Sequence, residues 1–361
     1  MKKITSLLIL ALVVSISLSS CSSDDDAPIT EEEEEEIPLG DYENGSFILN
    51  EGNGNPATAS IAFLGDDGVL VNDIFRSVNP DAEEIGSFLQ NIFFDDTRAF
   101  IISGSANSVT VLDRYTFEYI ETVTGDFEAP RYGAVANGFA YVTNTGDYAT
   151  GDDDFFTVIN LQDYSTTRID LSNWSEKVLE ENGKLYIANG YYGDGNSISV
   201  FNAQNNTVEA TIDLGPNNSP NSIKVEDGVL YVLTSGFDVQ SKVFEIDLAS
   251  NEIADTVAVP SEIGRASNLV VEDDLVYFTS GASVYSVGVD ENDISTEPVL
   301  TYESNSEYGV MYGFNVEEDG IYISDGGDFS SNSKAFKYSL DGMLLETYTV
   351  GVGPNGFYEN D

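Results

Sequence analysis

Apolar and polar residues alternate along most of the chain in short runs, and turn residues separate these runs. Residues 180–217 show the pattern: apolar positions alternate through LYIAN and SISVFN, and the steps NG, GDG and NN lie between the runs. The pattern predicts antiparallel β-strands joined by hairpin turns. A sheet of three short strands cannot bury its apolar face alone, so this segment is predicted to be one copy of a larger array.

One short element recurs seven times along the chain. In each copy an aromatic residue is followed by two mostly β-branched or small residues and then by a small polar residue. The aromatic anchors are separated by 53, 41, 45, 45, 46 and 45 residues. A period near 45 residues with four strand-like runs is typical of β-propeller blades. The anchors are Phe47, Phe100, Tyr141, Tyr186, Tyr231, Tyr277 and Tyr322.

We therefore expect an all-β fold, a seven-bladed β-propeller of four-stranded antiparallel blades over residues 46–361. The first anchor strand has no preceding strand to lie on its inner side. The chain ends in GPNGFYEN, which resembles the segment SPNSIKVE that opens the fifth copy. We expect this last segment to close the ring as the innermost strand of the first blade, with Phe357 beside Phe47. Closure leaves no exposed sheet edge there, whereas the alternative is an open solenoid of the same blades.

Residues 1–20 have the features of a lipoprotein signal peptide. Lys2 and Lys3 precede a twelve-residue apolar stretch that ends at Leu18. This stretch is too short to span a bilayer, because a spanning helix needs about 20 residues. The following Ser-Ser-Cys completes a sequence that resembles a lipobox. We expect the only cysteine, Cys21, to be lipidated at the mature N-terminus and to anchor the protein in the outer membrane; the alternative is a buried free thiol.

Residues 21–45 are predicted to form a disordered acidic tether. They contain three consecutive aspartates and six consecutive glutamates, and such runs cannot bury apolar surface. The Ser-Asp-Asp-Asp sequence after Cys21 resembles the surface-export signals of Bacteroidota-type lipoproteins. This resemblance implies a cell-surface location, and the alternative is an acidic spacer in a lipoprotein that faces the periplasm.

Charge and composition exclude several function classes. The chain has 63 acidic and 14 basic residues, a formal net charge of −49, which disfavours nucleic acid as a partner. Histidine is absent, so a Ser-His-Asp triad and histidine-ligated zinc or haem are excluded. The single tryptophan, Trp174, rules out a WD-repeat array and the multiple-tryptophan pattern of quinone-cofactor propellers.

The repeat period, the aromatic anchor elements, the stretch FILNEGN at 47–53 and the ending GPNGF together resemble the YncE-like surface propeller lipoproteins. The resemblance covers residues 46–361. Some members of that family bind cobalamin at the cell surface and deliver it to a TonB-dependent transporter. The resemblance therefore implies binding rather than catalysis, a small-molecule ligand with a corrinoid as the first candidate, and an outer-membrane importer as partner.

Polar residues are predicted to surround one mouth of the central channel. The innermost strand of each blade begins about ten residues before its anchor, and the long loops after the third and fourth anchor strands share that face. The positions so obtained are Gln90, Arg131, Glu176, Asn221, Ser267, Tyr312 and Asn355. The alternative is that these side chains only bond strand ends around a water-filled channel.

Aromatic and basic residues on the same face predict a ligand-binding surface, because tyrosine and tryptophan offer large apolar area with a polar group. The alternative is packing between neighbouring loops. The predicted ligand-binding residues are Arg131, Tyr132, Trp174, Lys177, Tyr191, Tyr192, Asn221, Arg265, Tyr312 and Asn355.

Four aspartates in the loop after the third anchor strand, Asp147, Asp152, Asp153 and Asp154, offer oxygen ligands of the kind that Ca²⁺ prefers. Their spacing lacks the glycine and the distal glutamate of an EF-hand, and a solvated acidic loop is the alternative. No catalytic residue and no other cofactor is predicted. Two further functions stay open: a protein-interaction or adhesion propeller, and a metal-dependent lactonase-like hydrolase.

Overall fold

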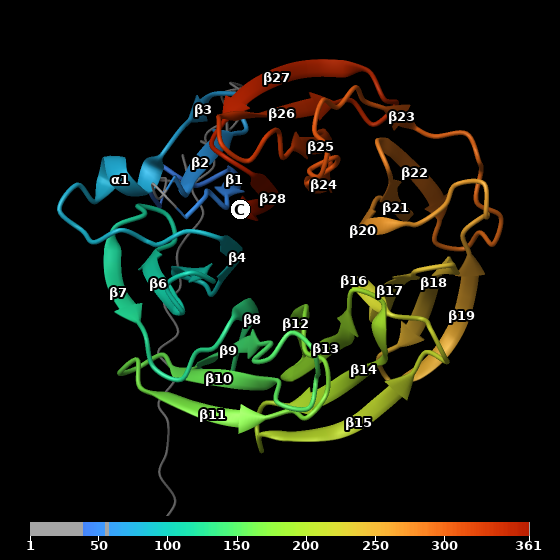
Figure 1. Ribbon diagram of the computed structural model, residues 1–361, viewed down its shortest axis with the longest axis horizontal. Helices are drawn as coiled ribbons and strands as arrows, with labels where there is room; N and C mark the ends of the chain where they lie inside the picture. The colour runs from blue at the N-terminus through green and yellow to red at the C-terminus, as the bar shows by residue number, and fades with distance from the viewer. Residues whose placement is uncertain (1–38, 55–57, 361) are drawn as a thin grey trace, which may run out of the picture. The chain divides into compact units, whose positions relative to one another are not determined.

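In the described residues the alternating segments form 28 strands, arranged as seven four-stranded antiparallel sheets around a central channel (Figure 1). The structure is a computed structural model that describes residues 39–54 and 58–360, so the predicted signal peptide and Cys21 lie outside the described residues. The seven-bladed β-propeller is confirmed. Within 39–54 and 58–360 no helix is long and apolar enough to cross a membrane.

Each blade runs from an innermost strand at the channel to an outermost strand at the rim. The innermost strands of blades one to seven are β28 (Pro354–Asn360), β4 (Leu89–Phe94), β8 (Pro130–Ala136), β12 (Val178–Glu181), β16 (Pro220–Glu226), β20 (Ser267–Glu272) and β24 (Gly313–Glu317). The anchor strands are β1 (Gly45–Asn50), β5 (Arg98–Ser103), β9 (Phe139–Asn144), β13 (Lys184–Tyr191), β17 (Val229–Gly236), β21 (Leu275–Ser280) and β25 (Gly320–Asp325). The third strands are β2 (Ser60–Gly65), β6 (Ser108–Asp113), β10 (Phe155–Asn160), β14 (Asp194–Asn202), β18 (Val239–Asp247), β22 (Ser283–Gly288) and β26 (Ser333–Tyr338). The outermost strands are β3 (Leu70–Val71), β7 (Tyr119–Val123), β11 (Thr166–Asp170), β15 (Thr207–Asp213), β19 (Glu252–Ala258), β23 (Leu300–Thr301) and β27 (Leu344–Val350).

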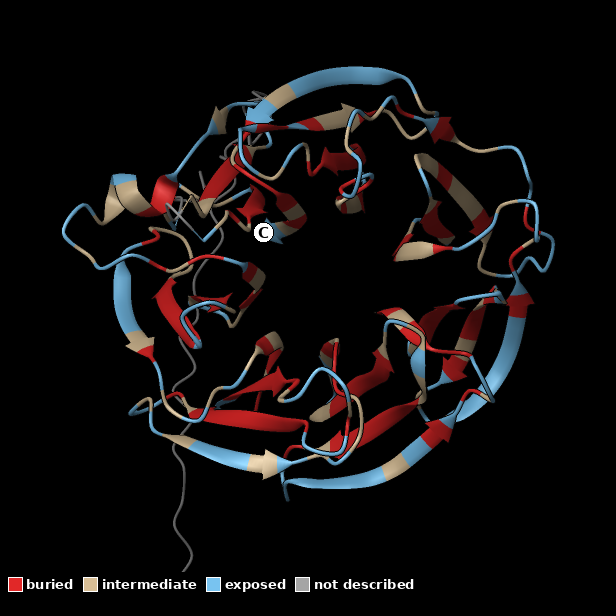
Figure 2. Cartoon of the chain, viewed as in Figure 1, coloured by how far each residue is buried: buried red, intermediate tan, exposed pale blue. Residues whose placement is uncertain are grey.

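The apolar pattern determines which strands are buried. All seven aromatic anchors are buried in the anchor strands, and the outermost strands carry the most exposed residues (Figure 2). The hairpin turns have the predicted chemistry: Asn182-Gly183 and Asp227-Gly228 each place two consecutive residues at positive φ, the backbone that a tight two-residue turn requires. The aromatic side chains therefore pack between blades, while the loops at the two ends remain free to carry function.

The C-terminal strand closes the ring as predicted. Strand β28 pairs antiparallel with β1, but the register differs by one residue, because Phe357 lies opposite Ile48 and Phe47 lies opposite Tyr358. The ring of Phe357 packs instead toward blade seven, with its centroid 5.6 Å from that of Tyr322. Residues from the two ends of the described chain thus build one blade and seal it against its neighbour.

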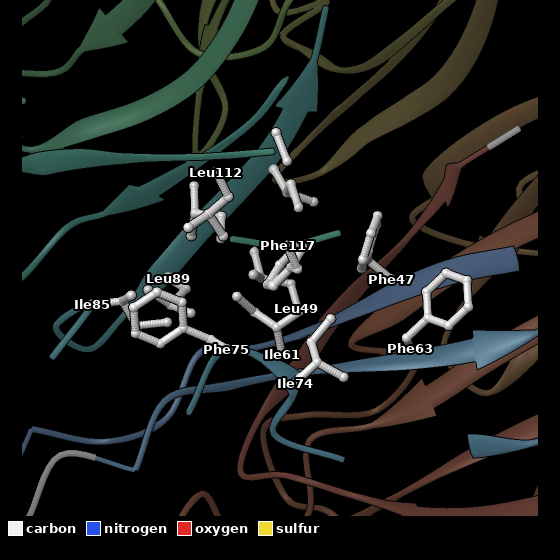
Figure 3. Close-up of a cluster of buried hydrophobic side chains, with 13 residues drawn as sticks. Phe47, Leu49, Ile61, Phe63, Ile74, Phe75, Ile85, Leu89, Leu112 and Phe117 are labelled. Carbon is white, nitrogen blue, oxygen red and sulfur yellow. The ribbon is translucent and has the colours of Figure 1, made fainter. Parts of the chain in front are cut away.

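The 53-residue spacing between the first two anchors is explained by an insertion between β3 and β4. It contains the only helix of the described residues, α1 (Ile74–Val78). Ile74 and Phe75 are buried in a cluster between blades one and two, together with Phe47 and Phe117 (Figure 3). The helix therefore covers the apolar side of the blade where β3 is only two residues long.

The blade includes residues before the predicted boundary at 46. The ring of Tyr42 lies 5.4 Å from that of Phe63 and 5.8 Å from that of Phe117, and its carbonyl accepts a hydrogen bond from the Asn360 side chain. Residues 39–45 therefore pack on blade one, next to the end of β28.

Candidate ligand site at one mouth of the channel

A cavity of about 530 Å³ runs between the innermost strands of all seven blades. A smaller pocket of about 180 Å³ opens beside it at the end where the innermost strands begin, and Arg131, Tyr132 and Lys177 line both spaces. Nine of the ten predicted ligand-binding residues line one of these spaces, and Trp174 joins them by stacking on Tyr191. The blade topology thus brings together residues that are up to 224 positions apart, from Arg131 to Asn355.

One ring position differs from the prediction. Asn268 lines the channel in blade six, where Ser267 was expected. Strand β20 has an irregular register between Ser267 and Val270, and Asn268 has a positive φ. This bulge shifts the channel-facing position by one residue, as bulges do when they redirect a side chain.

Arg131 and Glu176 form an ion pair between blades three and four. Arg131 Nε lies 3.1 and 3.2 Å from the two carboxylate oxygens, and Nη2 lies 3.2 Å from Oε2. The side chains are 20% and 12% exposed, and the remaining guanidinium nitrogen donates to Gln90. Burial raises the pKa of Glu176, and the charge of Arg131 opposes that rise. The pair therefore adds little net charge to the mouth.

An aromatic stack forms the wall above this ion pair. The rings of Trp174 and Tyr191 are parallel within 17° with centroids 5.5 Å apart, and Tyr192 meets Tyr191 edge-on at 4.7 Å. Gly151 allows the backbone of Trp174 to approach closely, because a Cβ at position 151 would lie 2.4 Å from the Trp174 backbone nitrogen. Trp174 and Tyr191 therefore pack between neighbouring loops, as the alternative to a ligand-binding role predicted. Tyr192 remains exposed.

Exposed aromatic side chains surround this end of the channel, which we call the aromatic mouth. Each follows an anchor strand or precedes an innermost strand, so the up-and-down blade topology places all of them on one face. Phe88, Tyr148, Tyr192, Phe237 and Tyr308 are each between 47% and 82% exposed. Phe88, Phe237 and Tyr308 were not predicted. Their positions within the repeat are visible in the sequence, but the exposure of their side chains is not.

Arg265 supplies a positive charge at the aromatic mouth. Its guanidinium carbon lies 5.0 Å from the centroid of the Phe237 ring, and Nε donates to Ser235 at 3.3 Å. Ser235 also accepts a bond from Asn221, whose own Oδ1 is buried without a hydrogen-bond partner. A cation held over an exposed aromatic face is well placed to meet a ligand with a polar edge.

Glu51 is a further channel residue that the sequence analysis did not select. Its carboxylate accepts a bond from the Tyr312 hydroxyl at 2.8 Å and one from Asn355 Nδ2 at 3.1 Å. Burial raises the pKa of Glu51, and these two bonds oppose the rise. Tyr312 and Asn355 are therefore partly engaged within the ring. Comparison of the repeats could have identified Glu51, because it is the only charged residue at this position. The matching positions in the other blades are Gly104, Thr145, Gly190, Ser235, Gly281 and Gly326.

The four aspartates of the loop after β9 are not gathered at one point. Asp153 accepts a bond from the backbone of Asp147 at 3.1 Å, and Asp154 is turned inward, 1% exposed, and accepts a bond from the Ser175 backbone. In 39–54 and 58–360 no group of three or more acidic side chains is placed to hold a metal ion. Calcium binding by this loop stays an untested prediction.

Asp154 makes the stability of the propeller depend on pH. Burial, with a smaller effect of the charges of Asp153 and Glu176, raises its pKa from 3.8 to about 7, although the hydrogen bond from Ser175 opposes the rise. The folded state therefore binds the proton more tightly than the unfolded state, and stability falls as pH rises from about 4 to about 7. We expect Asp154→Asn to increase the free energy of unfolding at about pH 8 by about 2 to 4 kcal/mol. Urea unfolding at about pH 4 and about pH 8 measures this, because the increase should vanish at the lower value.

The exposed Asp152 gives the matched control. Asp152→Asn should leave unfolding unchanged at both values, since that side chain is already solvated. An equal gain from both variants would assign the effect to net charge instead of to the buried carboxyl group.

Solved structures with the same fold are numerous, and the three that follow share at most 16% sequence identity with this chain. A quinoprotein alcohol dehydrogenase-like protein from Bacteroides thetaiotaomicron has a TM-score of 0.66 at 15% identity, over 89% of this chain and 79% of that one. Hydrazine synthase from Kuenenia stuttgartiensis has a TM-score of 0.59 at 16% identity, over 76% and 92%. Apo AztD from Citrobacter koseri has a TM-score of 0.54 at 12% identity, over 87% and 96%. Because one of them is named as an enzyme, the fold alone does not decide between binding and catalysis.

Sequence comparison gives the family. No curated protein matches the chain. A family model matches residues 44–337, which make up most of the propeller and include the aromatic mouth. The chain belongs to the family described as domain of unknown function, DUF5074.

Proposed function

We propose that this protein is a lipid-anchored binding protein that captures a small molecule with a broad ring surface at the aromatic mouth. The observation that carries the proposal is the set of exposed aromatic rings around Arg131 and Arg265 on one face. Exposed rings of this size are costly in water unless a ligand covers them, and aromatic and arginine side chains dominate binding surfaces.

The proposal extends to the cellular role through the resemblance to the YncE-like lipoproteins. A corrinoid is the first candidate ligand, followed by tetrapyrroles and glycans. Lipidation at Cys21 holds the protein at the outer membrane, with the propeller at the cell surface, and the ligand passes to a TonB-dependent transporter. Since the chain has no histidine, it offers no imidazole to the metal of such a ligand and grips the periphery of the ring instead.

The mouth variants Tyr192→Ala and Phe237→Ala test the site. Each removes an exposed ring without opening the core, so we expect the fold to persist and the affinity for a corrinoid to fall at least about tenfold, as for hot-spot aromatics. Trp174→Ala with Tyr191→Ala should lower it further, because the supporting stack is lost. Isothermal calorimetry against corrinoids, tetrapyrroles and glycans measures the effect.

Phe139 is the matched control, since it is a partly exposed phenylalanine at the start of β9, at the other end of the channel. Phe139→Ala should bind as the wild type does. If the mouth variants bind equally well, the aromatic mouth is not the site.

A protein partner is the second candidate function. The exposed rings come from blades two, three, four, five and seven, and such a spread suits a broad protein surface as well as a single ligand. A calorimetric screen in which no small molecule binds would favour this adhesion or scaffold role.

A further inference from the structure

Two lysines face the interior of the channel without an acidic partner. Lys177, just before β12, and Lys224, in β16, both line the cavity of about 530 Å³. Among the described residues no carboxylate oxygen lies within ion-pair distance of either ammonium group, whereas Arg131 beside them is paired with Glu176. Lys177 is partly exposed and Lys224 is exposed, so both ammonium groups are accessible to a ligand in the channel. Such unpaired cations are unusual in a chain of net charge −49.

The two lysines also affect each other. Burial and the charge of Lys224 together lower the pKa of Lys177 to about 8, against the opposing effect of Glu176. The ring of Tyr132 is the other close neighbour, with its centroid 5.8 Å from Lys177 Nζ. Like charges held near one another are destabilising until an anion lies between them. Two like charges on one cavity therefore favour the binding of an anion between them.

The charges along the channel give the direction of approach. Glu226, Glu272, Glu317 and Glu359 lie at the ends of innermost strands, and their charges raise the pKa of Lys224, against the larger lowering by burial. We call this end the acidic mouth. It repels anions. The aromatic mouth carries the positive charge of Arg265 beside the neutral pair of Arg131 and Glu176, so an anion is steered in from the aromatic side.

We infer that the channel binds an anionic group, a carboxylate or a phosphate, between Lys177 and Lys224, with the aromatic mouth as its way in. The anion site is inferred from the two lysines and the cavity alone. It does not depend on whether the aromatic mouth binds the ligand proposed above. A ligand with a ring body and an acidic arm would occupy the aromatic mouth and the anion site together.

Citrate and inorganic phosphate are the probes, each measured by calorimetry and by thermal unfolding against sodium chloride of equal ionic strength. We expect saturable binding and a higher melting temperature with at least one of the two, and the better probe identifies the anionic group. The variant with both Lys177→Met and Lys224→Met should lose at least about tenfold in affinity, since charge-assisted contacts are removed.

Lys184 provides the matched control, because it lies in β13 next to Glu209, with Nζ 3.6 Å from the carboxylate, outside the channel. Lys184→Met should bind the anion as the wild type does. In anion-free buffer Lys177→Met should melt at the same temperature as the wild type or higher, because it removes the like-charge interaction with Lys224. A melting temperature that drops would show that the lysine is structural and would overturn the inference.

Two results would overturn the inference directly. One is the absence of saturable binding of citrate and phosphate to the wild type at about 10 mM, the range of very weak affinity. The other is a double variant that binds within twofold of the wild type. Tyr192→Ala should leave citrate and phosphate binding intact, so failure of the anion site and failure of the aromatic site are distinguishable.

Discussion

Removal of residues 351–361 should abolish cooperative unfolding of the propeller. The truncation takes away β28, so β1 becomes an unpaired edge and blade one keeps only β1, β2 and the two-residue β3. It also removes Phe357 from its contact with Tyr322 of blade seven, which opens the ring at a blade boundary. Circular dichroism melting and limited proteolysis should show a broad transition and early cleavage, because an open ring exposes strand edges and apolar faces.

A synthetic peptide of residues 351–360 gives the control for this truncation. Added in excess, it should restore a sharp transition by pairing with β1, as strand addition does in other sheets. A truncated protein that melts in one sharp step at the wild-type temperature would mean that closure by β28 does not hold the ring together.

Glu176→Gln should lower the free energy of unfolding by about 3 kcal/mol, since it leaves the Arg131 guanidinium largely buried without a carboxylate. Gln90 already accepts one bond from Arg131 but carries no charge to balance it. Urea unfolding at neutral pH measures the loss.

The double variant Arg131→Met with Glu176→Leu is the matched comparison. It replaces both charges with apolar groups of similar size, and such replacements of buried pairs are close to neutral. We expect its stability to lie within about 1 kcal/mol of the wild type. If Glu176→Gln were as stable as the wild type, water in the channel would be balancing the arginine.

The repeat made most of the fold predictable. Blade number, strand order within blades and ring closure follow from a recurring aromatic anchor and from a C-terminal segment that resembles an innermost strand. Helix α1 was not predictable, because a segment of five residues is too short to establish a helical period. The one-residue offset between Phe47 and Phe357 was also hidden, since register depends on which face of β28 meets blade seven.

The candidate site was predictable in location and less so in detail. Counting back from the anchors identified the channel positions because the blade topology repeats. Which of those residues pair with each other, such as Arg131 with Glu176, depends on side-chain reach across a blade boundary. The channel position in blade six was predicted at Ser267 and lies at Asn268, because the bulge that shifts it cannot be recognised in a single sequence.

The two ends of the described chain leave the propeller together at blade one. The backbone of Asn44 donates to Asn360 at 3.0 Å, and both lie where β1 begins and β28 ends, on the side of the acidic mouth. Anything attached to either end of the described chain is therefore joined to the propeller on the acidic side. The exposed tyrosines and phenylalanines lie at the opposite end of the channel, where such an attachment leaves them accessible.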